Sequence, residues 1–154
     1  MNLIKKYKFF FILSIIILYY IYNWNIYIKF YLNSGIFKLK VCLCVIGKNE
    51  NLYINEFIDY YKNLGYNHIY LCDNNDINDE KFEDVIKNEI DNGFVSLIDY
   101  RGYNGININP QLNAYKDCYK KNNKKWDWLS FFDVDEYLQL IPLNLKIHDF
   151  LGIL

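Results

Sequence analysis

The chain has 154 residues, and a domain of this length buries roughly 70% of the surface that its unfolded chain exposes. Hydrophobic residues make up 53% of the sequence and charged residues 23%, a balance that excludes an intrinsically disordered chain. The formal net charge is −1 at pH 7, whereas a protein that binds nucleic acid needs a basic surface. We therefore expect a folded domain and no nucleic-acid partner.

An apolar segment without charged residues runs from Phe9 to Ile28. Twenty residues of α-helix span about 30 Å, the thickness of the hydrocarbon core of a membrane. The positive-inside rule keeps the preceding end in the cytosol because it carries Lys5, Lys6 and Lys8. We expect a single-pass type II membrane protein whose domain lies in the lumen of the endoplasmic reticulum or Golgi. The predicted parts are a cytosolic tail over 1–8, a signal anchor over 9–28, a stem over 29–39 and a domain over 40–154.

Two other interpretations of this N-terminal segment remain open. A cleaved signal peptide has an apolar region of about 7 to 15 residues, a length similar to that of the stretch 9–22. However, no small-x-small cleavage site follows the segment. The remaining alternative is a buried helix of a soluble domain.

The four cysteines are Cys42, Cys44, Cys72 and Cys118. A single C-x-C pair is a weak signal for zinc when no second pair accompanies it. A luminal domain permits a disulfide, but cysteine is also among the residues most often buried as a free thiol. We expect buried free thiols.

Four β-rich apolar runs alternate with three helical patterns from residue 41 onward. The runs are 41–47, 68–73, 94–99 and 128–133, and helices are expected within 50–65, 79–93 and 109–121. Gly65 is placed to end the first helix, and Asn109 and Pro110 are placed to begin the third. This alternation predicts an α/β fold of the Rossmann-like type, with a mostly parallel sheet covered by helices on both faces.

Each predicted strand ends in polar residues: GKNE from residue 47, DNND from 73, DYRG from 99 and DVDE from 133. Open parallel sheets bind ligands outside the carboxyl ends of their strands. The sequence therefore predicts a binding site at this edge.

Asp133 and Asp135 follow the last predicted strand, and strand geometry would place both side chains on the same side of the sheet. Two carboxylates that lie close together repel each other unless a cation lies between them. Hard divalent ions prefer carboxylate oxygens, and Mg²⁺ is often held by one or two carboxylates together with substrate phosphates. The pattern favours a metal-diphosphate site, and a solvated acidic turn is the alternative.

The order of these motifs resembles that of glycosyltransferases of the GT-A type, specifically glycosyltransferase family 92 and its family-2-like relatives. The similar residues are a strand ending in K-N-E, an N-E-F within the first helix, an L-G before H-I-Y-L-C-D-N, a Gln leading a helix with D-C, and a strand ending in D-V-D-E. The resemblance covers about residues 40–151. It implies the nucleotide-binding half of a GT-A fold.

The resemblance also implies roles for individual residues. Asp133 and Asp135 would bind a divalent ion, Mn²⁺ or Mg²⁺. Glu136 is expected to cap the following turn, Glu56 belongs to the family's pattern, and Asp59 is expected on a solvated helix face. The predicted contacts to the nucleotide-sugar donor are Lys48, Asn49, Glu50, Asp73, Arg101, Gln111 and Asp133.

The function implied by the resemblance is that of a glycosyltransferase, inverting, with a glycan or glycoprotein as acceptor. In the resembling families the catalytic base lies in the part of the domain after D-x-D, and only nineteen residues follow Asp135. We therefore expect the acceptor half to be missing, and a non-catalytic membrane-anchored remnant is the alternative function. A rival enzyme class, the haloacid-dehalogenase-type phosphatases, normally has Thr or Val where this chain has Tyr137.

The last residues, KIHDFLGIL, predict the start of another amphipathic helix. A parallel sheet needs both faces covered, and this helix would lack a packing partner. We expect an exposed apolar patch and low stability of the piece 40–154, because four side chains would stay unpartnered: Ile147, Phe150, Leu151 and Leu154.

Overall fold

The computed structural model describes residues 16–24, 39–102, 109–141 and 145–152. The chain divides into two compact units, Met1–Lys38 and Leu39–Leu154. Each unit is described by itself.

In the first unit, residues 16–24 are helical and their side chains are exposed. Among the residues that the structure describes, no helix has the length and apolar character needed to cross a membrane. The remainder of the predicted signal anchor, 9–15 and 25–28, lies outside the described residues. The same holds for the predicted tail 1–8 and for nearly all of the predicted stem.

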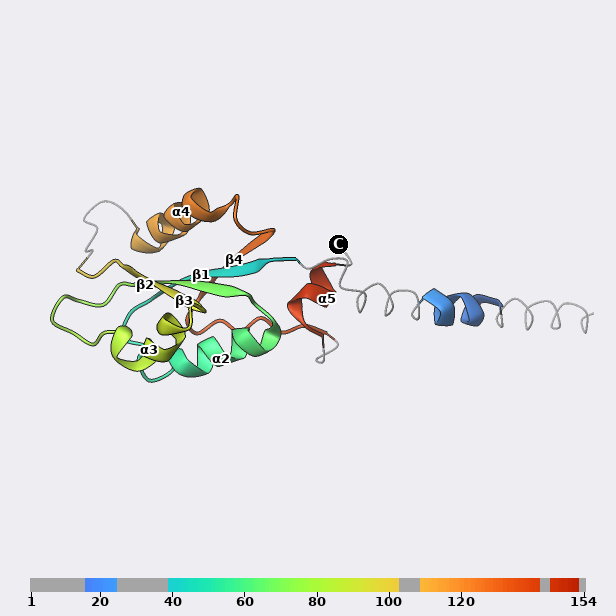
Figure 1. The fold of residues 1–154 in the computed structure, drawn as a ribbon, viewed down its shortest axis with the longest axis horizontal. Helices are drawn as coiled ribbons and strands as arrows, with labels where there is room; N and C mark the ends of the chain where they lie inside the picture. Colours follow the sequence, from blue (N-terminus) through green and yellow to red (C-terminus); the bar gives the residue numbers. More distant parts are fainter. Residues whose placement is uncertain (1–15, 25–38, 103–108, 142–144, 153–154) are drawn as a thin grey trace, which may run out of the picture. The chain divides into compact units, whose positions relative to one another are not determined.

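The second unit is built around a parallel four-stranded sheet with the order β3-β2-β1-β4 (Figure 1). The predicted bounds of the first, second and fourth strands are confirmed at both ends. The third strand in the chain begins one residue later than predicted. The first five residues of β1 are at most 1% exposed, which explains why its sequence is apolar on both faces. The strands are β1 (Val41–Gly47), β2 (His68–Asp73), β3 (Val95–Asp99) and β4 (Trp128–Asp133).

Helices α2 (Ile54–Leu64) and α3 (Glu83–Asp91) cover one face of this sheet (Figure 1). The buried residues of α2 recur at helical spacing and pack against alternate residues of β1 in one apolar core. α2 ends at the predicted Gly65, whose φ of 102° is a left-handed conformation that glycine adopts without steric cost. The core residues of these two elements are Ile54, Phe57, Ile58 and Tyr61 of α2 and Val41, Leu43 and Val45 of β1.

Helix α4 (Pro110–Asn122) covers the opposite face of the sheet (Figure 1). The side chain of Asn109 accepts hydrogen bonds from the backbone N–H groups of Gln111 and Leu112, which confirms Asn109 as the N-cap and Pro110 as the first helical residue. Helices lie on both faces of a parallel sheet, so the predicted α/β architecture is confirmed.

A disulfide joins Cys44 of β1 to Cys118 of α4. The expectation of free thiols is therefore wrong for this pair, and it is correct for Cys42 and Cys72, which are buried. The two bonded cysteines are 74 positions apart and meet only because α4 packs on β1. Nothing in the local sequence pattern predicts their contact.

Helix α5 (Ile147–Leu151) corrects another expectation, because it has packing partners. Ile147 is buried in the apolar core and Leu151 packs against that core. Ile147 lies beside Gly65, at the end of α2. Phe150 is exposed as predicted, and Leu154 lies outside the described residues. The expectation of low stability rests on a helix without packing partners, and Ile147 and Leu151 do have such partners.

We expect reduction of the Cys44–Cys118 disulfide to destabilise the domain. For a closed loop of this length, the chain-entropy account gives about 4 kcal/mol, and loss of a native disulfide commonly costs about 2–5 kcal/mol. Chemical denaturation of the purified chain with and without a reductant measures the difference. The control is Cys44→Ala/Cys118→Ala, which should not respond to the reductant. An equal response of the wild type and this variant would contradict the disulfide.

Candidate functional site

The loops that follow β1, β2 and β3 are hydrogen-bonded to one another at the carboxyl edge of the sheet. Asn75 lies at the centre of these contacts, with a fully buried side chain. Its Oδ1 accepts a hydrogen bond from the backbone N–H of Asn49 at 2.6 Å, and its carbonyl oxygen accepts one from the N–H of Gly102 at 3.0 Å. Asn49 and Gly102 both have positive φ angles, 61° and 68°. Asn75 therefore holds two turns, and the conformation of Asn49 is one that residues other than glycine seldom adopt.

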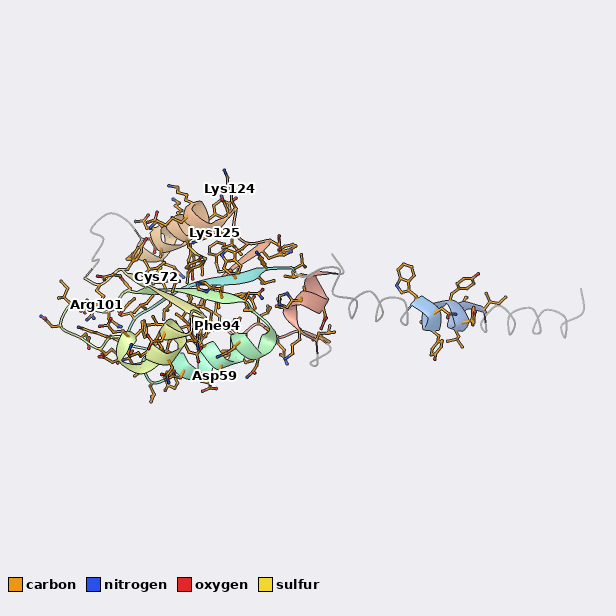
Figure 2. All side chains as sticks on the ribbon, viewed as in Figure 1. Asp59, Cys72, Phe94, Arg101, Lys124 and Lys125 are labelled. Atoms are coloured by element: carbon orange, nitrogen blue, oxygen red, sulfur yellow. A yellow bond between two sulfur atoms is a disulfide. The ribbon has the colours of Figure 1, made fainter. Side chains whose placement is uncertain are left out.

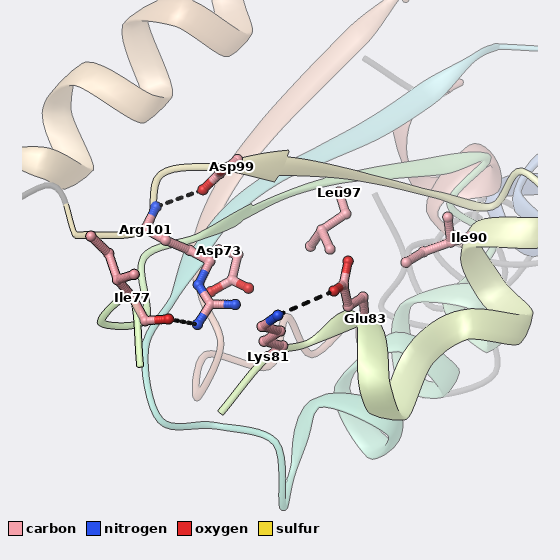
Figure 3. A pocket seen from close by; sticks show the side chains of 8 residues that line it. All are labelled: Asp73, Ile77, Lys81, Glu83, Ile90, Leu97, Asp99 and Arg101. Atoms are coloured by element: carbon pink, nitrogen blue, oxygen red, sulfur yellow. Dashed lines mark hydrogen bonds and ion pairs between the residues drawn. The ribbon is translucent and has the colours of Figure 1, made fainter. Parts of the chain in front are cut away.

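Asp73, the last residue of β2, is 2% exposed and borders a cavity of about 670 Å³ (Figure 3). Its carboxylate accepts hydrogen bonds from the backbone N–H groups of Asn75 at 3.0 Å and Phe82 at 3.5 Å. These two donors replace the water that a buried carboxylate loses. The cavity lies on the α3 side of the sheet, and its other lining residues are Ile77, Lys81, Glu83, Ile90, Leu97, Asp99 and Arg101.

Arg101 is half-buried beside this cavity and organises the loop that follows β2 (Figure 3). Its Nη2 donates to the carbonyl oxygens of Asp76, Ile77 and Asp79 at 2.9 to 3.1 Å. Its backbone N–H donates to the carboxylate of Asp99 at 2.9 Å. Arg101 thus has a structural function, and its predicted contact to the donor stays a prediction.

The loop after β1 contains the predicted donor contacts Lys48, Asn49 and Glu50. Lys48 pairs with Asp76 at 2.9 Å on the surface. The carbonyl oxygen of Glu50 accepts hydrogen bonds from the first turn of α2. Burial raises the pKa of Tyr137, and the nearby carboxylates, which include those of Glu56, Asp135 and Glu50, raise it further. Glu50 and Asp135 therefore both act electrostatically on the same tyrosine, although their loops follow different strands.

Asp133, the last residue of β4, points toward α4. Its Oδ1 accepts a hydrogen bond from Nε2 of Gln111 and lies 2.8 Å from the hydroxyl of Tyr115. That hydroxyl is also 2.9 Å from the carbonyl oxygen of Phe132, so its proton is shared between two acceptors. Burial raises the pKa of Tyr115, and the carboxylate of Asp133 raises it further. The Tyr115 hydroxyl therefore keeps its proton and acts as a donor to Asp133.

Asp73 and Asp133 lie on opposite faces of the sheet. Asp73 aligns with Gly47 of β1, whereas Asp133 aligns with Ile46, and successive residues of a strand point to opposite faces. The structure thus places Asp73 with Arg101 on the α3 side and Asp133 with Gln111 on the α4 side. A ligand that contacts both groups must cross the carboxyl end of β1.

Asp135 does not continue β4, because the strand ends at Asp133. The N–H of Glu136 donates to the carbonyl oxygen of Asp133 at 3.0 Å and closes a turn. Oε2 of Glu136 also accepts from the N–H of Asp133 at 3.0 Å, so this side chain closes back on the turn 133–136, and its predicted capping of a following turn stays a prediction. The argument from strand alternation is therefore wrong for Asp135, which is exposed in this turn.

The carboxylates at the end of β4 fit a hard divalent ion that obtains further ligands elsewhere. Within the described ranges, no group of three or more His, Cys, Asp or Glu side chains could hold a metal ion. Asp133 and Asp135 offer carboxylate oxygens, and Mg²⁺ commonly completes its coordination with phosphate and water. The described residues therefore do not form a metal centre by themselves, and a metal-diphosphate site at Asp133 and Asp135 stays a prediction.

Asn75 and Tyr115 belong to this edge although the sequence did not single them out. Tyr115 follows Gln111 by four residues, and that spacing on a helix predicts a shared face. Asn75 carried no signal, because a polar residue within DNND is typical of a solvated turn. It is buried only because the loops after β1 and β3 close over it.

Residues 37–154 match the family model of glycosyltransferase family 92. The chain belongs to glycosyltransferase family 92. It is 25% identical to a family 92 protein of Ricinus communis over an alignment of 114 residues, and the match covers 71% of this chain and 19% of that protein. It is 26% identical to one of Oryza sativa subsp. japonica over 111 residues, with 72% and 18% covered. A third, from Arabidopsis thaliana, is 28% identical over 109 residues, with 68% and 17% covered.

This member of family 92 thus spans about a fifth of the length of the curated relatives that it matches. No solved structure matches the chain. The match confirms the resemblance that the strand-end motifs predicted.

We expect Asn75→Ala to loosen the carboxyl edge of the sheet. The change leaves the N–H of Asn49 without its acceptor, and a lost hydrogen bond at a buried site costs about 1–3 kcal/mol. Chemical denaturation should show this loss, and amide hydrogen exchange should become faster at residues 48–50. Asn88→Ala on the exposed side of α3 is the control and should change neither quantity. Unchanged exchange at 48–50 in Asn75→Ala would refute the linking role of Asn75.

Proposed function

We propose that this domain binds the donor of a metal-dependent glycosyltransferase, which transfers a sugar from a nucleotide-sugar donor to a glycan or glycoprotein acceptor. Membership of family 92 supports the reaction class. The observation that carries the proposal is the position of Asp133 beside Ile46 at the end of β1, with Asp135 in the turn that follows. The strand order changes direction at β1, and open parallel sheets bind ligands at such a point.

In this proposal the donor crosses the carboxyl end of β1. The nucleoside occupies the cavity beside Asp73 and Arg101, whose volume of about 670 Å³ is within the ordinary range for small-molecule sites. The diphosphate extends toward Asp133 on the other face. The loop Lys48 to Glu50 lies between the two groups and contacts the middle of the donor.

Asp133 and Asp135 would hold the divalent ion, Mn²⁺ or Mg²⁺. Such an ion stabilises the negative charge that develops on the departing nucleoside diphosphate. Gln111 and Tyr115 both engage Oδ1 of Asp133, so they fix the orientation of this carboxylate. Its Oδ2 accepts no hydrogen bond from the described residues and is available to a ligand. Positioning of this kind reduces the reorganisation that the site needs when the donor binds.

We also propose that an N-terminal signal anchor holds the domain in the lumen of the endoplasmic reticulum or Golgi. The apolar stretch 9–28 and the lysines before it support this orientation. The Cys44–Cys118 disulfide supports it independently, because disulfides persist in oxidising compartments and are rare in the cytosol.

We expect Asp135→Asn to weaken metal-dependent binding of a nucleoside diphosphate by a factor of ten or more, about 1.4 kcal/mol. The change keeps the size of the side chain and removes one of the two carboxylate charges. Titration of the full chain with a panel of nucleoside diphosphates, with and without Mn²⁺, measures the effect.

The matched control is Asp59→Asn, which removes the same charge from the exposed side of α2 (Figure 2). This variant should bind like the wild type. If both variants bind a nucleoside diphosphate and Mn²⁺ equally well, the residues 133–136 are only an acidic turn and the proposed donor site fails.

We expect a tag at the C-terminus to be protected from protease in intact microsomes and digested once detergent opens them. Lys5, Lys6 and Lys8 would keep the other end on the cytosolic side. Digestion of the tag in intact vesicles would overturn the proposed orientation.

A further inference from the structure

Helix α4 carries a repeated pair of a tyrosine and a lysine. Tyr115 and Lys116 are followed four residues later by Tyr119 and Lys120. One helical turn advances about 5.4 Å, so the two pairs lie one above the other on the same side of the helix. This repeat lies beyond the residues that the proposed donor site uses, apart from the hydroxyl of Tyr115.

The two pairs border a shallow groove between α4 and β4, with a volume of about 400 Å³. Phe131 of β4 completes its lining, and the rings of Tyr115 and Phe131 are 5.2 Å apart. Tyr119 is 53% exposed, so an aromatic face is open to a ligand. The groove therefore has apolar ring surfaces with two lysine side chains along its border.

The α4 segment is strongly basic, in contrast with the remainder of the chain. Residues 110–125 contain five lysines and one acidic residue, whereas the other residues of the chain contain twelve basic and seventeen acidic ones. The acidic residue of this segment, Asp117, accepts a hydrogen bond from the hydroxyl of Tyr100. We call the five exposed lysines the basic face: Lys116, Lys120, Lys121, Lys124 and Lys125.

The charges of the basic face are not neutralised within the described part of the chain. The ion pairs there involve Lys48, Lys62, Lys81 and Lys87, and none involves the basic face. Lys125 donates to the amide oxygen of Asn122, which is uncharged. Lys124 and Lys125 lie beyond the end of α4, on the side of the sheet away from α2 and α3 (Figure 2). This surface therefore attracts an anionic partner.

The groove adjoins the candidate donor site through Tyr115. The ring of Tyr115 lines the groove, and its hydroxyl contacts Asp133. The disulfide to β1 holds α4, and with it the groove, against the sheet. A ligand in the groove is thus placed beside the end of β4 by a covalently tethered helix.

We propose that the groove between α4 and β4 binds an acidic glycan, a chain of sugars that carries carboxylate or sulfate groups. The flat apolar faces of sugar rings stack on exposed aromatic rings, and anionic substituents pair with lysines. A membrane surface is the competing occupant, and the vesicle probe below tests it. A nucleic acid fits less well because the disulfide indicates an oxidising compartment.

The binding claim stands without the proposed function, whereas the identification of this glycan as the acceptor rests on it. In that case the groove presents the acceptor beside Asp133. The anionic groups of the glycan pair with lysines of the basic face. They stay away from the carboxylates of the donor site, which would repel them.

The test is titration of the full chain with four probes. These are an oligogalacturonate, a heparin oligosaccharide, a neutral malto-oligosaccharide of the same length, and phosphatidylcholine vesicles with and without phosphatidylserine. We expect binding of one or both acidic oligosaccharides, with an affinity that falls as salt is added, and little binding of the neutral one. The uronate and sulfate probes show which anionic group the groove prefers.

Matched variants assign the binding to the groove. Lys116→Gln/Lys120→Gln should weaken it by a factor of ten or more, corresponding to about 1.4 kcal/mol. Tyr119→Ser should weaken it several-fold at unchanged charge, and Tyr119→Phe should bind like the wild type. Lys62→Gln/Lys87→Gln makes the same change of charge on α2 and α3, away from the groove, and should have no effect on glycan binding. Each of these lysines has an ion pair on the surface, and Lys62 also lies over the ring of Phe94.

Several results would overturn the proposal. These are no binding of either acidic probe, equal binding of the neutral probe, or equal loss in the α4 and the α2/α3 lysine variants. If Lys116→Gln/Lys120→Gln weakens binding to phosphatidylserine vesicles and neither acidic glycan binds, the groove would instead be a membrane contact. Binding of nucleoside diphosphate and Mn²⁺ is measured on the same samples. If the nucleoside diphosphate binds and the acidic glycans do not, only the glycan groove is rejected. If the glycans bind and the nucleoside diphosphate does not, only the donor site is rejected.

Discussion

The candidate site depends on one constraint, the position of β1 between two parallel neighbours. β1 pairs with β2 on one side and with β4 on the other, and helices cover both of its faces. Because β1 has no free edge and no solvated face, nearly every one of its side chains is buried. Its backbone polar groups are satisfied by the neighbouring strands, so the loop at its carboxyl end begins from a fixed position.

The end of β1 also leaves little space for side chains. A Cβ atom at Gly47 would lie 2.8 Å from Cγ2 of Val134 and 2.9 Å from Cζ of Phe82. These neighbours belong to the turn after β4 and to the start of α3, which both fold over the strand end. The glycine thus allows the turn after β4 and the start of α3 to approach each other over the end of β1. A larger residue would push apart the elements that position Asp73 and Asp133.

Helix α4 connects stability with the site. Its disulfide ties it to β1, its first two turns provide Gln111 and Tyr115 to Asp133, and it carries three of the five lysines of the basic face. A helix held only by side-chain packing could shift by small amounts, and hydrogen bonds to a carboxylate tolerate little displacement. The covalent tether therefore restricts the one element on which the orientation of Asp133 depends.

The sequence by itself determined the strands, the helices, the caps at Gly65 and Asn109, and the family, because these follow from local periodicity and from motifs a few residues long. It also located the polar strand ends, because a parallel sheet places all of them at one edge. Only the tertiary structure decided that Cys44 pairs with Cys118, that Asn75 is buried, and that Ile147 packs in the core. It also decided that Asp73 and Asp133 lie on opposite faces, since strand register is set by pairing. Each of these outcomes requires contacts between segments distant in the chain, and no local pattern encodes which distant surface a side chain will meet.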